Sequence, residues 1–237
     1  MSVSVRGEAV TPTRRERQRQ QTLAEIKTRA MGQVAEGGAG SVSLNAIARA
    51  MGMSPAALYR YFASRDALLA ELVVEAYGSL ADAVQQAADG APGDGEAQLV
   101  AVAHAYRDWA LAHPNSYLLI FQTTSGSGLD LDPDRTVAAA QRSMDVFLSV
   151  LDGPGSGPDT GGTKLDPVLA RRIRAWGKRA QPPDLPAGRL YLGLLTWTRL
   201  HGLISLELGH HLASTGVDPA LLYEAEVQSL LQRARLS

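Results

Sequence analysis

Hydrophobic residues recur along most of the chain at the three- and four-residue spacing of an amphipathic helix. No segment shows the sustained alternation of apolar and polar residues that marks a half-buried strand. The pattern therefore predicts an all-α protein. Clusters of Gly, Pro and Asp separate the helical segments. We expect helices over residues 13–37, 44–51, 55–62, 65–88, 96–112, 115–122, 134–151, 166–179, 187–212 and 218–234.

The second and third predicted helices form a short hairpin with its own start and stop signals. Ser43 can cap the first of them, and Gly52 supplies the left-handed residue that ends it. Ser54 and Pro55 then provide a cap and a first-turn proline for the second helix. The segment 43–62 is therefore predicted to be a helix-turn-helix. The apolar residues of its first helix share one face: Leu44, Ile47, Ala48 and Met51.

The second helix of this hairpin has an inward face made by Leu58 and Phe62, which lie four residues apart. Ala56 and Ala57 are small enough to let the helix backbone approach the floor of a DNA major groove. A helical hairpin is also a packing unit in many proteins, so a purely structural role is the alternative. The residues predicted to contact DNA are Ser54, Ala56, Ala57, Tyr59, Arg60, Tyr61 and Arg65.

Charge is distributed unevenly along the chain. Residues 1–70 contain ten Arg or Lys and five Asp or Glu, a net charge of +5. Subtraction from the totals of 23 basic and 24 acidic residues leaves 13 and 19, a net charge of −6, for the remainder. A basic segment joined to an acidic body is expected where one end of a protein touches a polyanion. A solvated basic tail is the alternative.

The N-terminal region resembles the TetR family of bacterial transcriptional regulators over about fifty residues. The resemblance rests on Ile26 and Ala30, on Ser43 with Ile47-Ala48, and on the run Met-Gly-Met-Ser-Pro-Ala-Ala-Leu-Tyr-Arg-Tyr-Phe-Ala-Ser-Arg-Asp-Ala-Leu-Leu at 51–69. Met53 and Arg65 stand where Val and Lys are more usual in the family. These two departures are mild.

This resemblance implies roles for three of the predicted DNA-contacting residues. Tyr59 and Tyr61 would contact backbone phosphates or base edges, and Arg65 would contact a phosphate. Arg60 lies at a variable position of the family, so it either reads guanine or binds phosphate. The basic run Arg14, Arg15, Arg17 and Arg19 is either an arm that follows the duplex or an exposed helix start with solvated charges.

The segment 195–208 resembles the C-terminal ligand-binding and dimerisation domain of one TetR branch, which is marked by Trp and, four residues later, His-Gly. Trp197, His201 and Gly202 match that pattern. Trp197 and His201 share a helix face, where they either fill core and hydrogen-bond a buried partner or line a pocket. The candidate ligand-binding residues are Tyr106, Trp109, Tyr117, Phe121, Gln122, Met144, Trp197 and His201.

Several kinds of chemistry find no support in the sequence. The absence of cysteine removes disulfides, thiolate metal sites and cysteine nucleophiles. His210 and His211 follow Glu207 at a spacing that can pair metal ligands on a helix, but no third ligand converges. No Gly-rich phosphate loop, Ser/His/Asp signature or paired-carboxylate motif stands out. We therefore expect no enzymatic activity, no cofactor and no metal.

We expect a cytoplasmic protein that does not span a membrane. The polar N-terminal residues 1–29 contain no apolar core of a secretory signal. The most apolar stretch, 190–208, carries Arg199, His201 and Glu207, which favour a buried helix of a soluble protein. A cysteine-free chain is compatible with a reducing compartment.

These observations predict a sequence-specific transcriptional regulator with a DNA-binding domain at 1–67 and a ligand-binding and dimerisation domain at 68–237. We expect a homodimeric repressor that binds double-stranded DNA at an inverted-repeat operator and is released by a small apolar or aromatic effector. The alternatives are a regulator or activator without an effector and a helical enzyme or ligand carrier. The predicted dimer face comprises Leu192, Leu195, Leu203, Leu206, Leu222, Val227, Leu230 and Leu231.

Overall fold

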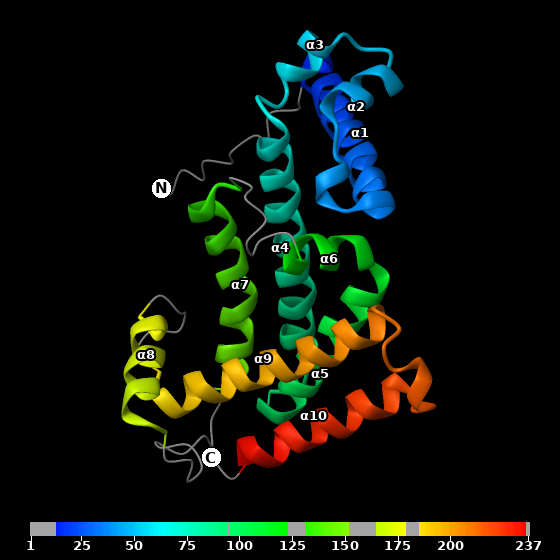
Figure 1. Cartoon of the computed structure of the whole chain (residues 1–237). Coiled ribbons are helices and arrows are strands. Elements are labelled where there is room, and N and C mark those ends of the chain that lie inside the picture. Colours follow the sequence, from blue (N-terminus) through cyan, green and yellow to red (C-terminus); the bar gives the residue numbers. More distant parts are fainter. Residues whose placement is uncertain (1–12, 94, 123–130, 152–164, 179–184, 236–237) are drawn as a thin grey trace, which may run out of the picture. The chain divides into compact units, whose positions relative to one another are not determined.

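The computed structural model of the chain describes residues 13–93, 95–122, 131–151, 165–178 and 185–235 (Figure 1). These residues are almost entirely helical and contain no strand, which confirms the predicted all-α class. The helices are α1 (Arg14–Gly37), α2 (Leu44–Ala50), α3 (Pro55–Tyr59), α4 (Arg65–Gly90), α5 (Gly95–Ala112), α6 (Pro114–Gln122), α7 (Pro133–Leu151), α8 (Pro167–Gly177), α9 (Ala187–Leu208) and α10 (Pro219–Arg235), with short 3-10 helices at Ala39–Ser41 and Ala213–Thr215.

The chain folds into two compact units, residues 1–69 and residues 70–237. The division falls inside α4, so this one helix begins in the first unit and continues through the second. The sequence-based boundary at 67/68 lies within the same helix. No domain linker separates the helix-turn-helix from the rest of the chain.

The core of the first unit is built by the apolar faces that the sequence predicts. Ile26, Ala30 and Val34 follow one another at four-residue intervals on α1 and are buried. Helix α1 packs against α2, and α2 packs against α3. The buried residues that α2 and α3 supply to this core are Leu44, Ile47, Ala48 and Leu58.

The helices of the hairpin are capped as their sequence predicts. The Ser43 hydroxyl accepts a hydrogen bond from the Ala46 amide at 3.3 Å, and the Ser54 hydroxyl accepts one from the Ala57 amide at 3.2 Å. Gly52, between the two helices, has a φ of +64°, which is the left-handed conformation that ends α2. These local signals specify the hairpin without help from distant residues.

Helix α3 is shorter than the predicted segment 55–62 and ends at Tyr59. The Tyr61 amide donates to the Leu58 carbonyl three residues back, so the chain tightens and leaves the helix. The reason lies a few residues further along the chain, where the Ser64 hydroxyl accepts from the Ala67 amide and caps α4. Phe62 remains buried, as predicted.

Helix α9 is central to the second unit, where it packs against α5, α7, α8 and α10 (Figure 1). Its contact with α7 is close at Gly193, where an added Cβ would lie 2.5 Å from Leu148 Cδ2. Leu200 and Ile204 continue the buried face of α9 and are fully buried. No helix of the described residues is long and apolar enough to cross a membrane.

The C-terminal end of α9 lies at Leu208, four residues before the predicted end at 212. Gly209 comes after the helix, and His210 adopts a left-handed φ of +56°, which no helix can continue through. His210 and His211 therefore do not share a helix face with Glu207, and the spacing argument for a pair of metal ligands fails. Glu207 instead forms an ion pair with Arg107 of α5.

Half of the predicted dimer face is not available on the surface of the subunit. Leu192, Val227, Leu230 and Leu231 are at most 5% exposed because α9 and α10 pack against each other and against α5. Leu206 is 41% exposed, and Leu221, which was not among the predicted positions, is 69% exposed. Of these two exposed leucines on α9 and α10, one was predicted and one was not.

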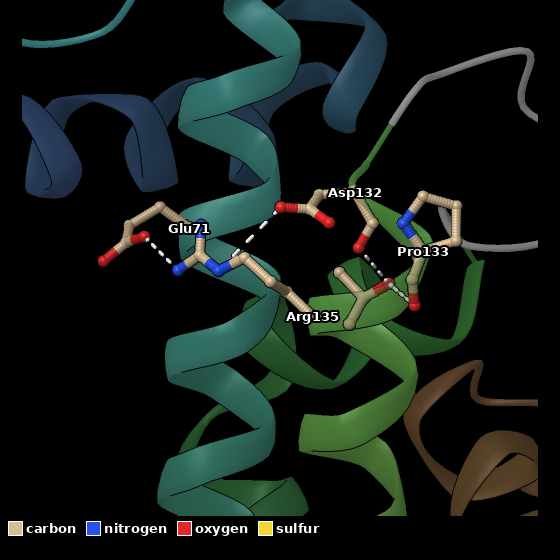
Figure 2. A network of polar contacts seen from close by, with 5 residues as sticks. Glu71, Asp132, Pro133 and Arg135 are labelled. Carbon is tan, nitrogen blue, oxygen red and sulfur yellow. Dashed lines mark hydrogen bonds and ion pairs between the residues drawn. The ribbon is translucent and has the colours of Figure 1, made fainter.

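Ion pairs join α7 to α4 within the second unit. Figure 2 shows Arg135 of α7 reaching Glu71 of α4, with a nitrogen–oxygen distance of 2.9 Å, and a longer contact of 3.9 Å to Asp132. The Glu71 carboxylate also holds the pKa of Arg135 above its usual value. Further along the same two helices, Arg142 pairs with Asp82.

The conformation of Gly52 leads to a test of the hairpin. Because an L-residue in the left-handed region costs about 1–2 kcal/mol, Gly52→Ala should destabilise the first unit by that amount. In amide hydrogen exchange of the full chain, peptides from residues 43–62 should then exchange about 5–30 times faster. Gly32→Ala is the matched control, because Gly32 lies in the middle of α1 with open space around it. Gly32→Ala should slow amide exchange. If both variants change the exchange rate in the same direction, the predicted role of Gly52 in the hairpin is wrong.

Candidate functional site

The surface of the first unit around α3 carries the residues predicted to contact DNA. Ser54, Ala56 and Arg60 are exposed, and Tyr59 is 46% exposed. Ala57, Tyr61 and Arg65 are partly buried. Leu58 and Phe62 point the opposite way, into the core. All seven predicted side chains thus lie outside the buried core of the first unit.

The side chains of two of these residues also have a hydrogen-bond or ion-pair partner nearby in the sequence. The Ser54 hydroxyl accepts its capping bond from the Ala57 amide, and its O–H remains able to donate. Arg65 Nε lies 3.3 Å from Asp66 Oδ1, while the Arg65 side chain remains 39% exposed. Arg65 can therefore reach an anion with the other edge of its guanidinium group.

A basic hollow of about 810 Å³ adjoins this surface within the first unit. It is lined by Arg14, Arg15, Gln18 and Arg19 of α1 and by Arg60 and Tyr61, which come after α3. The Arg19 guanidinium lies over the Tyr61 ring, 5.2 Å from its centroid. The arginine run and Tyr61 were singled out separately from the sequence, and their meeting was not predicted.

The second unit contains an apolar cavity of about 280 Å³. Five helices contribute to it, from α4 to α9. No acidic or basic side chain is among its described lining residues. The lining residues are Tyr77, Phe121, Val137, Ala140, Gln141, Ser143, Met144, Trp176, Leu194 and Trp197.

Three of the eight predicted ligand-binding residues, Phe121, Met144 and Trp197, line this cavity. Trp109 lies elsewhere, buried against His113, and its indole nitrogen donates to the Ser79 hydroxyl at 3.0 Å. The side chain of Gln122 lies outside the described residues. The remaining three, Tyr106, Tyr117 and His201, form a hydrogen-bonded network next to the cavity.

The other seven lining residues were not predicted from the sequence. Val137, Ala140 and Gln141 share one face of α7 with the predicted residue Met144 at helical spacing. The sequence pattern could therefore have indicated this part of the lining. Tyr77 and Trp176 lie far apart in the sequence on α4 and α8, and no local signal connects them to the cavity.

The polar network is centred on His201 of α9. The Tyr117 hydroxyl donates to the His201 carbonyl at 3.1 Å and lies 2.7 Å from His201 Nδ1 and 2.8 Å from the Ser205 hydroxyl. The other ring nitrogen, Nε2, lies 3.5 Å from the Ser205 oxygen. The Tyr106 hydroxyl also approaches Nδ1, at 3.3 Å.

Aromatic rings enclose His201 and keep it neutral. Its ring stacks on Trp197 with centroids 5.5 Å apart and lies 4.4 Å from the ring centroid of Phe121. Burial lowers the pKa of His201 below its usual value. Burial also raises the pKa of Tyr117 to about 12, so neither group carries a charge near neutral pH. His201 thus supports the cavity wall formed by Phe121 and Trp197.

Comparison with known proteins places both units in one family of regulators. Residues 26–72 match the family model described as bacterial regulatory proteins, tetR family, and residues 99–230 match the one described as Tetracyclin repressor-like, C-terminal domain. The HTH-type transcriptional regulator Rv1816 of Mycobacterium tuberculosis is 34% identical over 219 residues, which cover 90% of this chain and 92% of the relative.

Solved structures agree with this assignment. The structure of SCO4313, described as a regulatory protein, is 41% identical with a TM-score of 0.78 and covers 94% of this chain and 100% of that chain. A more distant structure is that of the transcriptional regulator FadR from Bacillus subtilis, in complex with stearoyl-CoA. It is 13% identical with a TM-score of 0.59, covers 88% of this chain and 97% of that chain, and shares the fold.

The partly buried, neutral His201 predicts a pH dependence of stability. Because its pKa is lower in the folded state than the unfolded value of about 6.5, the unfolded chain binds the proton more readily as the pH falls below that value. The free energy of unfolding should therefore be highest above about pH 6.5 and should fall as the pH is lowered from about 7.5 to about 5.5. Urea unfolding followed by tryptophan fluorescence reports on this unit, since Trp109, Trp176 and Trp197 all lie in it.

The matched variant for this test is His201→Gln, which removes the titrating group and keeps a polar side chain. Its free energy of unfolding should change less over the same pH range than that of the wild type. An equal change in both proteins would show that His201 is not the group responsible.

Proposed function

The chain belongs to the tetR family of helix-turn-helix transcriptional regulators, and we propose that it is a homodimeric repressor released from DNA by a small apolar effector. The observation that carries the proposal is the pairing of an exposed helix-turn-helix surface in one unit with an uncharged cavity in the other. Because its partner is chromosomal DNA, we expect the protein to act in the cytoplasm and to have no catalytic role.

The first part of the proposal is that α3 reads base pairs in the major groove. The side chains of Ser54 and Ala56 are exposed and small, so the N-terminal end of α3 can approach the base edges closely. Tyr59 and Arg60 are exposed and can reach phosphates or base edges at the other end of α3. Arg65, at the start of α4, supplies a further phosphate contact.

The second part is that two subunits bind together. A two-fold dimer presents two copies of α3 to successive major-groove faces, which predicts an operator with an inverted repeat. Leu206 on α9 and Leu221 on α10 supply exposed apolar area that such a dimer would bury. Dimers of this kind are typical of the family.

The third part concerns the chemistry of the effector. A cavity of about 280 Å³ without a charged residue in its described lining suits an uncharged apolar or aromatic molecule. A charged ligand group placed there would lose part of its hydration and gain no ion pair from the described lining. Four aromatic rings, those of Tyr77, Phe121, Trp176 and Trp197, offer faces and edges against which a flat molecule can stack.

Helix α4 provides the connection between the effector and the DNA. Tyr77 of α4 lines the cavity, and its hydroxyl donates to the Ile120 carbonyl at 3.4 Å. A molecule that displaces Tyr77 therefore acts on the same helix that begins at Arg65, next to the DNA-contacting residues. The two α3 helices of a dimer must stay about 34–36 Å apart on DNA, so a change in the direction of α4 disturbs their match. A coupling free energy of about 1–3 kcal/mol suffices to weaken operator binding about 5- to 150-fold.

Operator binding is tested first. The wild-type protein should enrich inverted-repeat duplexes from a random-sequence pool and bind them with two chains per duplex, as measured by light scattering. Arg65→Ala and Tyr59→Phe should weaken binding to all duplexes, and Arg65→Ala should lower the slope of log affinity against log salt by about 0.9. Arg171→Ala, on the exposed face of α8, is the control for loss of charge. Unchanged affinity in both test variants would refute the assigned contacts.

Effector binding is tested with uncharged aromatic compounds such as indole, naphthalene and biphenyl. A compound that occupies the cavity should quench tryptophan fluorescence through Trp176 and Trp197 and lower operator affinity. Trp197→Ala should reduce this release while operator binding without the compound stays unchanged. Trp109→Phe should retain the response, because Trp109 lies outside the cavity. If no compound in a broad screen alters fluorescence or operator affinity, the regulator works without an effector.

A further inference from the structure

The basic hollow of the first unit gathers four arginines, and no contact within the described residues balances their charge. Arg14, Arg15, Gln18 and Arg19 lie on one face of α1, and Arg60 and Tyr61 close the hollow from the end of α3. No acidic side chain is among the described residues that line it. Within the described part of the chain, none of its four arginines forms an ion pair with a carboxylate.

This clustering opposes the stability of α1. Arg15 and Arg19 are like charges four residues apart, which repel each other on a helix surface. Cations in the first turns of a helix also meet the positive end of its dipole. The start of α1 is already capped without them, because the Glu16 carboxylate accepts from the Thr13 amide at 2.6 Å. Electrostatic stabilisation of α1 therefore does not account for the placement of these arginines.

The position of Arg19 suggests what the hollow is built to hold. Its guanidinium lies 5.2 Å from the centroid of the Tyr61 ring, within the range of a cation–π contact. Such a contact restrains the flexible arginine from one face and leaves its N–H edges free to donate. An arginine held in this way is ready to meet an anion, and bidentate pairing with phosphate is the contact for which its geometry is suited.

We infer that Arg14, Arg15, Arg19 and Arg60 form one seat for the backbone phosphates of DNA and that Tyr61 acts by holding Arg19 in it. Arg60 belongs both to the hollow and to the exposed surface of α3, so the seat continues the surface that faces the duplex. Tyr61 is then a positioning residue, whereas resemblance to the family implied a direct contact with DNA. The inference rests on the proposed DNA-binding function.

The experiment measures binding of the full-length protein to two fluorescent duplexes of equal length over a range of KCl concentrations. One duplex is selected by the wild type from a random pool and the other is of random sequence. Arg15→Gln and Arg19→Gln should each weaken binding to both duplexes about tenfold and lower the salt slope by about 0.9. Arg17→Gln is the matched control, because Arg17 lies on the same helix turn but does not line the hollow. If Arg19→Gln changes the slope no more than Arg17→Gln does, the seat does not exist.

The role of Tyr61 is tested by separating its ring from its hydroxyl. Tyr61→Phe keeps the ring beneath Arg19 and should bind DNA as the wild type does. Tyr61→Leu removes the ring and should match Arg19→Gln in affinity and salt slope. The double variant Arg19→Gln/Tyr61→Leu should be no weaker than either single variant. Equal losses in Tyr61→Phe and Tyr61→Leu would mean that the hydroxyl itself contacts DNA, which would overturn the positioning role.

Two measurements keep these outcomes distinct from other failures. Far-UV circular dichroism should be the same for all variants and the wild type, and no arginine variant should unfold at a lower temperature than the wild type, so that lost binding is not lost folding. A wild type that shows no preference for any duplex would refute the proposed regulator. The inference fails separately if the wild type selects an operator and the arginine variants bind it equally well.

Discussion

The close approach of α7 to α9 at Gly193 is the packing constraint on which the second unit depends. An added Cβ there would lie 2.5 Å from Leu148 Cδ2, much closer than the roughly 3.5–4.0 Å at which carbon atoms pack. One helical turn away from this contact, the two helices present Met144 and Trp197 instead. The tight contact fixes the crossing of the helices, and the space that these longer side chains leave becomes part of the cavity. All described residues that line the cavity lie on helices.

The residues that line the cavity differ in polarity from the residues that lie behind them. The described lining is uncharged, whereas the layer behind Phe121 and Trp197 contains His201, Tyr117 and Ser205 in mutual hydrogen bonds. Each polar group in that layer satisfies another, so no buried donor there has to be met by a ligand. A neutral network of this kind gives the aromatic wall a defined orientation at little electrostatic cost. This division explains why His201 belongs to the site without facing its occupant.

The fold was predictable from the sequence to the extent that its signals are local. Ser43, Gly52 and Ser54 specify the hairpin through caps and a left-handed turn, and all three act as predicted. The ends of α3 and α9 were misplaced because each is set by a residue beyond the helix, the cap at Ser64 and the left-handed His210. The cavity was only partly predictable, since Tyr77 and Trp176 meet across about a hundred residues of chain and carry no shared pattern.

The four arginines that line the basic hollow differ in their surroundings from four arginines of the second unit. In the second unit, four arginines that lie on its helices pair with carboxylates of neighbouring helices and so contribute to how those helices pack: Arg107 with Glu207, Arg135 with Glu71, Arg142 with Asp82 and Arg199 with Glu226. In the basic hollow of the first unit, no described carboxylate plays that part, and an aromatic ring holds Arg19 instead. A carboxylate would neutralise the arginine it positions, whereas a ring positions it and leaves its charge available. The choice of partner thus distinguishes arginines that stabilise the fold from arginines that are kept ready for an external anion.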